Sequence, residues 1–152
     1  MVDVAAAHKH FSAWCFNQAW ELMEKIDRTE DDNRMMEALS HASIFHWSSR
    51  PDCSDRNLSI GYWQASRIQS ILGNAEETRR YAQTCLRYSA DLEPFYLGYA
   101  HEALARAASL ANDAATLSDR LAQAEWAARQ VTDEGQRQRL TNDLVQLRKH
   151  VA

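Results

Sequence analysis

Histidine and glutamate side chains are the first candidates for chemistry in this chain of 152 residues. His101 and Glu102 begin the pattern His-Glu-x-x-His, in which two histidines hold a zinc ion and the glutamate acts as a base. The second histidine of that pattern would stand four residues after the first, where the chain has Ala105. The signature is therefore incomplete, and we predict neither a metal site nor another cofactor.

Two further histidines, His41 and His46, lie five residues apart, so on a helix their side chains point about 140° away from each other. We expect each of them in the core or at an interface. The alternative is a small-ligand sensor or enzyme, in which a glutamate or histidine acts as acid or base in a polar pocket. That pocket would contain His41, His46, Trp63, Arg67, Glu102 and Arg106.

Signatures of nucleophilic catalysis and phosphate binding are missing from the chain. It contains neither Gly-x-Ser-x-Gly nor Gly-x-x-x-x-Gly-Lys, and four glycines leave little material for such loops. Neighbouring acidic residues such as Asp31 and Asp32 are typical of a first helical turn rather than of paired catalytic carboxylates. These features favour a protein without catalytic activity.

Charge and hydropathy narrow the set of partners. Lys and Arg total 17 against 21 Asp and Glu, a net charge of −4 that offers no general attraction to nucleic acid. No apolar run approaches the length of a membrane span, and the first residues do not form a signal peptide. The three cysteines form no Cys-x-x-Cys pair. We expect a cytoplasmic protein that binds neither nucleic acid nor membranes.

The elements that would position these side chains are helices. Four glycines and two prolines are too few for a turn-rich β-protein, and apolar residues recur at helical spacing along the chain. We predict an all-α protein of seven helices in a single domain over residues 1–152. The first six helices should end near residues 26, 48, 72, 92, 111 and 130, and a seventh should carry Leu140, Leu144, Leu147 and Val151 as an end cap.

Helix starts and buried faces follow from local patterns. Capping-box spacing is present at Thr29 with Asp32 and at Asn74 with Glu77. The third helix would be capped by Asp52 or Asp55, and the seventh by Thr132. The apolar stripes predicted for the first two helices are Phe11, Cys15, Ala19, Leu22 and Ile26, and then Met35, Ala38, Leu39, Ala42 and Phe45.

The first six helices form three hairpins that resemble one another. Aligning their turns gives offsets of 43 and 39 residues between the hairpins. Small or apolar residues then coincide at three equivalent positions of the second helices, which favours stacked repeats over an irregular bundle. The matched positions are Met35, Thr78 and Leu117, then Leu39, Ala82 and Leu121, and then Ala42, Cys85 and Ala124.

The hairpin from Tyr62 to Pro94 resembles a tetratricopeptide repeat (TPR), with small residues at Ala65-Ser66 and a Gly-Asn turn. The hairpin from Gly98 to Ala128 resembles a second repeat. The strings HASIFHW at 41–47, GYWQASRIQSILGNAEE at 61–77 and LGYAHEALARA at 97–107 are similar to segments of uncharacterised bacterial TPR-like proteins. The resemblance implies a TPR-like α-α superhelix of about three hairpins plus a C-terminal capping helix.

In such a superhelix the first helix of each hairpin lines a concave surface. Aligning these three helices brings Trp, Tyr and Arg side chains to matched positions, and these residue types concentrate binding energy at interfaces. We therefore expect a groove that binds an unidentified protein or peptide partner. The nine predicted groove residues are Asn17, Trp20, Glu24, Ile60, Trp63, Arg67, Tyr99, Glu102 and Arg106.

Structural roles compete with this interpretation. Glu102 and Arg106 are spaced for an ion pair within one helix. A terminal helix could also fill the groove of so short a superhelix. In that case the aromatic face of the first helix would pack on a second copy, giving a homodimer through Phe16, Trp20 and Met23.

Overall fold

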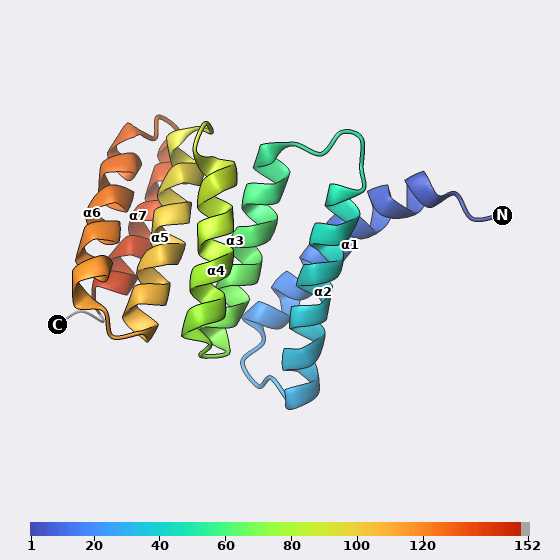
Figure 1. Ribbon diagram of the computed structural model, residues 1–152, viewed down its shortest axis with the longest axis horizontal. Helices are drawn as coiled ribbons and strands as arrows, with labels where there is room; N and C mark the ends of the chain where they lie inside the picture. The colour runs from blue at the N-terminus through green and yellow to red at the C-terminus, as the bar shows by residue number, and fades with distance from the viewer. Residues whose placement is uncertain (150–152) are drawn as a thin grey trace.

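The computed structural model describes residues 1–149, and over this range it contains seven α-helices and no strand (Figure 1). The all-α fold predicted from composition and periodicity is therefore confirmed. Val151, predicted to extend the seventh helix, lies outside the described residues. The helices are α1 (Val4–Glu24), α2 (Glu30–Ser48), α3 (Asp55–Ile71), α4 (Ala75–Ser89), α5 (Pro94–Leu110), α6 (Ala114–Gln130) and α7 (Glu134–Arg148).

The first six helices form three hairpins that stand side by side in chain order (Figure 1). Helix α3 packs more extensively against α5 than against α1. Helix α7 leaves this pattern and packs against both α5 and α6. Within residues 1–149, no helix combines the length and the apolar character that crossing a bilayer requires.

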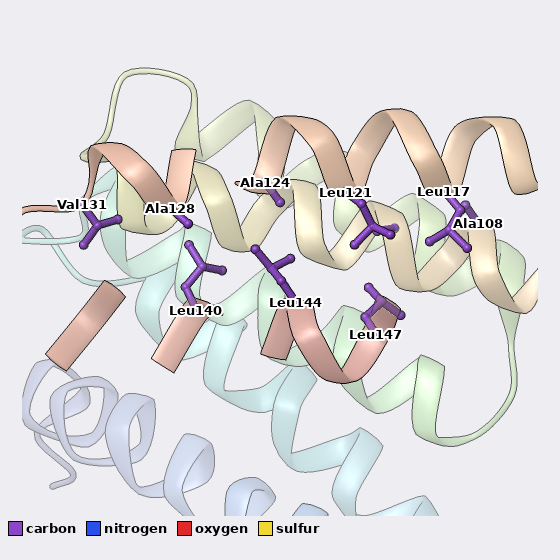
Figure 2. Packing of buried hydrophobic residues seen from close by; sticks show 10 residues of the cluster. Ala108, Leu117, Leu121, Ala124, Ala128, Val131, Leu140, Leu144 and Leu147 are labelled. Atoms are coloured by element: carbon purple, nitrogen blue, oxygen red, sulfur yellow. The ribbon is translucent and has the colours of Figure 1, made fainter. Parts of the chain in front are cut away.

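The largest apolar cluster holds the C-terminal half together. Leucines from α6 and α7 interlock over the alanines of α5, as Figure 2 shows. Leu140 is fully buried, and a Cβ atom on Gly98 would lie only 2.5 Å from its Cδ2 atom. The close approach of α7 to α5 therefore depends on the missing side chain at position 98.

Polar groups add to the apolar packing of the N-terminal hairpin. Ser43 Oγ of α2 donates to the Ser12 carbonyl of α1 at 2.7 Å, and Gln64 Nε2 of α3 donates to the Phe16 carbonyl of α1 at 3.0 Å. Ser40 is also buried. Small serine side chains let the helices approach closely, but they bury little apolar area.

The predicted face of α2 is wrong by about one residue. Met36, Ser40 and Ser43 are buried, whereas Met35 and Phe45 are more than half exposed. Ser43 faces α1, where its hydroxyl donates to the Ser12 carbonyl, and Met35 and Phe45 turn outward. The stripe of α1 is shortened in the same way, since Phe11 and Ile26 are exposed while Cys15 and Ala19 are buried.

The predicted helix caps are partly correct. Thr29 forms the expected capping box with Asp32. Ser54, not Asp52 or Asp55, caps α3, because its hydroxyl and the Asn57 side chain satisfy each other's backbone N–H groups. Asn74 makes no side-chain cap, since its amide donates to Gln69 Oε1 instead. Asp133 rather than Thr132 caps α7, and α4 ends at Ser89 rather than near residue 92.

Candidate binding groove

Helices α1, α3, α5 and α7 enclose a cleft of about 830 Å³, called the groove below. The first three of these helices are the leading members of the three hairpins. Helix α7 forms a further wall through Gln136, Arg139 and Asp143. Seven of the nine predicted groove residues line it, namely Asn17, Trp20, Glu24, Ile60, Trp63, Arg67 and Tyr99.

One aromatic ring from each leading helix contributes to a continuous surface, the aromatic wall of Trp20, Trp63 and Tyr99. The indoles of Trp20 and Trp63 stack with centroids 5.8 Å apart and planes 29° apart. Tyr99 meets Trp63 edge-on at 5.6 Å. These are the offset-stacked and T-shaped arrangements that aromatic pairs prefer, so the three helices hold each other's rings in place.

The polar edges of these rings are already satisfied. Trp20 Nε1 donates to Glu24 Oε1 at 2.9 Å, and Trp63 Nε1 donates to Glu102 Oε2 at 3.3 Å.

Tyr99 is held in the same way, because its hydroxyl donates to Asp143 Oδ2 at 2.6 Å. Burial and this hydrogen bond raise the pKa of Tyr99. The aromatic wall therefore leaves ring surface, rather than N–H or O–H groups, for a ligand.

Glu102 and Arg106, also predicted for the groove, do not line it. Glu102 is only 1% exposed, and it forms an ion pair with Arg106 one turn later on α5. The pair lies behind the aromatic wall, where Glu102 also accepts from Trp63. Their spacing had allowed this structural role, and their position makes them a support for the groove rather than part of its surface.

Arg67 differs from the carboxylates around the groove, which all accept a hydrogen bond. Its side chain lines the groove and is half-buried, and burial lowers the pKa of its guanidinium, with Arg106 lowering it further. Apart from the backbone hydrogen bonds of its helix, Arg67 makes one hydrogen bond within residues 1–149. Its backbone carbonyl accepts from Ser70 Oγ. Its guanidinium pairs with no carboxylate of that range.

Sequence reasoning missed the contribution of α7. Its residues Gln136, Arg139 and Asp143 recur at helical spacing beside the leucine stripe, so a common face was visible in the sequence. What the pattern could not supply is the direction in which α7 folds back. Phe95 and Tyr96, at the start of α5, also line the groove without having been predicted.

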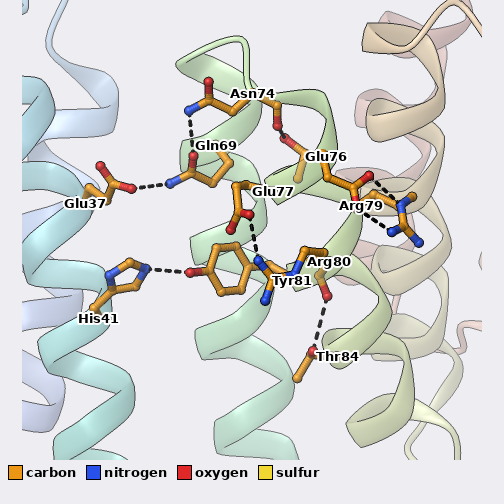
Figure 3. Close-up of polar contacts among 11 residues, drawn as sticks. Glu37, His41, Gln69, Asn74, Glu76, Glu77, Arg79, Arg80, Tyr81 and Thr84 are labelled. Carbon is orange, nitrogen blue, oxygen red and sulfur yellow. Dashed lines mark hydrogen bonds and ion pairs between the residues drawn. The ribbon is translucent and has the colours of Figure 1, made fainter.

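The two predicted pocket histidines lie away from the groove and from each other. His41 Nε2 is 3.0 Å from the Tyr81 hydroxyl, beside a polar network in which Gln69 bridges Glu37 and Asn74 (Figure 3).

His46 instead pairs with His8, their Nδ1 atoms 2.8 Å apart, and burial together with His8 lowers the pKa of His46. The structure therefore does not gather these histidines with Glu102 and Arg106. In the part of the chain that is described, no three His, Cys, Asp or Glu residues are grouped to hold a metal ion.

The residues predicted for a homodimer, Phe16, Trp20 and Met23, all line the groove instead of an outward face. A different apolar set is exposed on the N-terminal hairpin. It includes Phe11, Trp14, Met35 and Phe45.

Comparison with protein-family models, curated proteins and solved structures finds no match for this chain. The TPR-like resemblance therefore stays a prediction. The groove and its aromatic wall are the features of the chain that bear on its function.

Proposed function

We propose that this protein is a non-catalytic interaction module that binds an extended peptide segment of a partner protein in the groove. The observation that carries the proposal is the aromatic wall, in which three helices far apart in the sequence present stacked rings to one cleft. Rigid aromatic side chains supply contact area at low entropic cost and dominate binding energy at many interfaces.

The dimensions of the groove fit a short segment. Its lining residues on α3 run from Ser59 to Ile71, a span of about 18 Å at the rise of an α-helix. An extended chain covers that distance with about five or six residues. The groove is thus large enough to recognise a linear motif.

We further propose that the three hairpins form a TPR-like superhelix with α7 as its capping helix. The arrangement in which α1, α3 and α5 all reach one groove supports this interpretation, because stacked repeats place equivalent helices on a common side.

A homodimer through Phe16, Trp20 and Met23 is the competing proposal, since these side chains lie on the groove and a second copy could occupy it. Sedimentation at several concentrations separates the two. A concentration-dependent dimer that Trp20→Ala abolishes would replace the peptide proposal, whereas a monomer is expected if a peptide segment is the ligand.

The direct test is selection of binders from a random peptide library displayed on phage, followed by titration of the selected peptides. Trp20 is 37% exposed in the groove. We expect Trp20→Ala to weaken their binding at least about tenfold, because truncating an aromatic anchor costs more than about 1.4 kcal/mol.

Trp14→Ala provides the matched control. Trp14 lies on the same helix with a similar exposure of 44%, but it does not line the groove. Its loss should change the affinities less than about twofold. Enrichment of no peptide, or equal losses in the two variants, would contradict the proposal.

A further inference from the structure

Arg67 is the half-buried charged group in the groove that lacks a partner. Glu24 accepts from Trp20, Asp143 accepts from Tyr99, and Glu102 is bound by Arg106 and Trp63. Among residues 1–149, by contrast, Arg67 is bonded only at its backbone carbonyl. The groove therefore combines occupied carboxylates with a half-buried guanidinium that has no partner. Arg139 on α7 also has none within residues 1–149, but its side chain is exposed to water.

The partly buried position of Arg67 makes its positive charge energetically unfavourable. Its side chain is half-buried, and burial lowers the pKa of the guanidinium. A cation that has lost part of its hydration without gaining an ion pair is destabilised. An anion entering the groove would recover this energy, and the planar guanidinium can hold a carboxylate through two parallel hydrogen bonds.

The neighbouring charges do not provide this anion. The negative charges of Glu102 and Asp143 raise the pKa of Arg67, but neither carboxylate forms a hydrogen bond or ion pair with it. Glu102 is committed to Arg106, whose charge in turn lowers the pKa of Arg67. The guanidinium of Arg67 therefore keeps hydrogen-bond donors available to a ligand in the groove.

We infer that the peptide segment bound in the groove carries an internal Asp or Glu side chain that pairs with Arg67, flanked by apolar or aromatic side chains that lie on the aromatic wall. This inference rests on the proposed peptide-binding function. The acidic residue is placed inside the segment because the groove continues on both sides of Arg67, to Trp63 and Ser59 in one direction and to Ile71 in the other. A chain terminus at Arg67 would leave one side empty.

The test uses libraries of heptapeptides with acetylated N-termini and amidated C-termini. The central position is fixed as Asp, Asn or Lys, and the other six positions are randomised. A fourth library has Asn at the centre and a free C-terminal carboxylate. We expect the wild-type protein to retain the Asp library above the other three.

The best Asp-centred heptapeptide and its Asp→Asn counterpart are then titrated by fluorescence anisotropy. On the wild-type protein the change should lower affinity about ten- to hundredfold, because a charge-assisted hydrogen-bonded pair is lost. On Arg67→Gln the same peptide change should alter affinity less than about twofold. Arg67→Lys should give an intermediate loss, since it keeps the charge without the planar fork.

Arg129→Gln is the matched control, because Arg129 is exposed on α6 and outside the groove. It removes the same charge and should leave the preference for Asp over Asn unchanged. Melting followed by circular dichroism shows whether each variant is folded. The peptide-side comparison on the wild-type protein needs no variant and stays decisive if Arg67→Gln unfolds.

The outcomes separate the two proposals. If peptides bind and Trp20→Ala abolishes binding, but Asp and Asn libraries are retained equally, the inference about Arg67 is wrong and the proposed function stands. A preference for the free C-terminal carboxylate, or an Asp→Asn loss that persists in Arg67→Gln, also overturns the inference. Retention of none of the four libraries overturns both.

Discussion

At the scale of single residues, Glu102 connects the interior of the protein to the groove. One of its carboxylate oxygens binds Arg106 and the other accepts from the Trp63 indole. A buried carboxylate is stable only while such partners compensate for its lost hydration. Glu102 therefore holds in place both the guanidinium of Arg106 and the ring of Trp63 in the aromatic wall.

We predict that Glu102→Met destabilises the protein by about 2–4 kcal/mol, because it leaves the largely buried Arg106 without a counter-charge and Trp63 without an acceptor. Adding Arg106→Leu should recover much of this loss, since two apolar side chains leave no unpaired charge. Urea denaturation measures both effects. A loss below about 1 kcal/mol for the single variant would contradict the role given to Glu102.

Glu76→Gln is the control for this comparison. Glu76 forms an ion pair with Arg79 at spacing i,i+3, and both side chains are well exposed. Because water screens such a pair, its removal should leave the urea midpoint nearly unchanged.

At the scale of helices, small residues set how closely neighbours approach. Ala124 and Cys85 are fully buried at helix crossings. Burial raises the pKa of the Cys85 thiol to about 11, so this cysteine serves as a small core residue rather than as a nucleophile. Ala42 occupies the matched position of the first hairpin but is only half-buried, because α2 turns its serines inward.

We predict that Ala124→Leu costs about 1–3 kcal/mol, because three added carbon atoms cannot fit between α5, α6 and α7. Ala42→Leu, the matched substitution in the first hairpin, should cost less than about 1 kcal/mol, since its side chain can extend toward solvent. Thermal melting compares the two variants. Equal shifts would mean that the three hairpins pack alike, contrary to the burial found here.

At the scale of the whole molecule, packing is uneven from one end to the other. The C-terminal half has a leucine and alanine core closed by α7. The N-terminal hairpin packs on α3 around a smaller apolar cluster of Ala19, Met36 and Ile68, and Gln64 of α3 donates to the carbonyl of Phe16. Less buried apolar area means a lower free energy of local opening.

Native-state amide hydrogen exchange should therefore show α1 and α2 opening at a lower free energy than α5 and α6. Because Trp20 belongs to α1, a peptide bound in the groove should raise the protection of this hairpin more than that of α6. Uniform exchange along the chain would contradict the uneven packing. The measurement needs no substitution and uses the intact protein.

The helices and the capping box at Thr29 could be predicted because they depend on residues within a few positions of one another. The buried face of α2 could not, since the burial of Ser40 and Ser43 depends on how closely a neighbouring helix approaches and not on the apolar pattern of α2 itself. The same limit applies to Asn74, whose amide is taken by Gln69 rather than by the helix that follows.

For the groove, the predicted register correctly placed Trp20 and Trp63 on one surface at matched positions, and Tyr99 on the same surface one turn earlier in its hairpin. It could not distinguish Arg67, which lies open to the groove, from Arg106, which Glu102 holds in the interior. Both arginines occupy the same position of their hairpins. Only the packing of the third hairpin against its neighbours separates them.

The number of helices, their approximate ends and seven of the nine groove residues could be predicted from the chain alone, since local hydrogen bonding and periodicity encode these features. The tertiary structure alone decided that α7 folds back to wall the groove, that the histidines stay apart and that Arg67 lacks a partner within residues 1–149. These outcomes depend on which surfaces meet across long stretches of chain, and helix-helix packing, not local pattern, selects those surfaces.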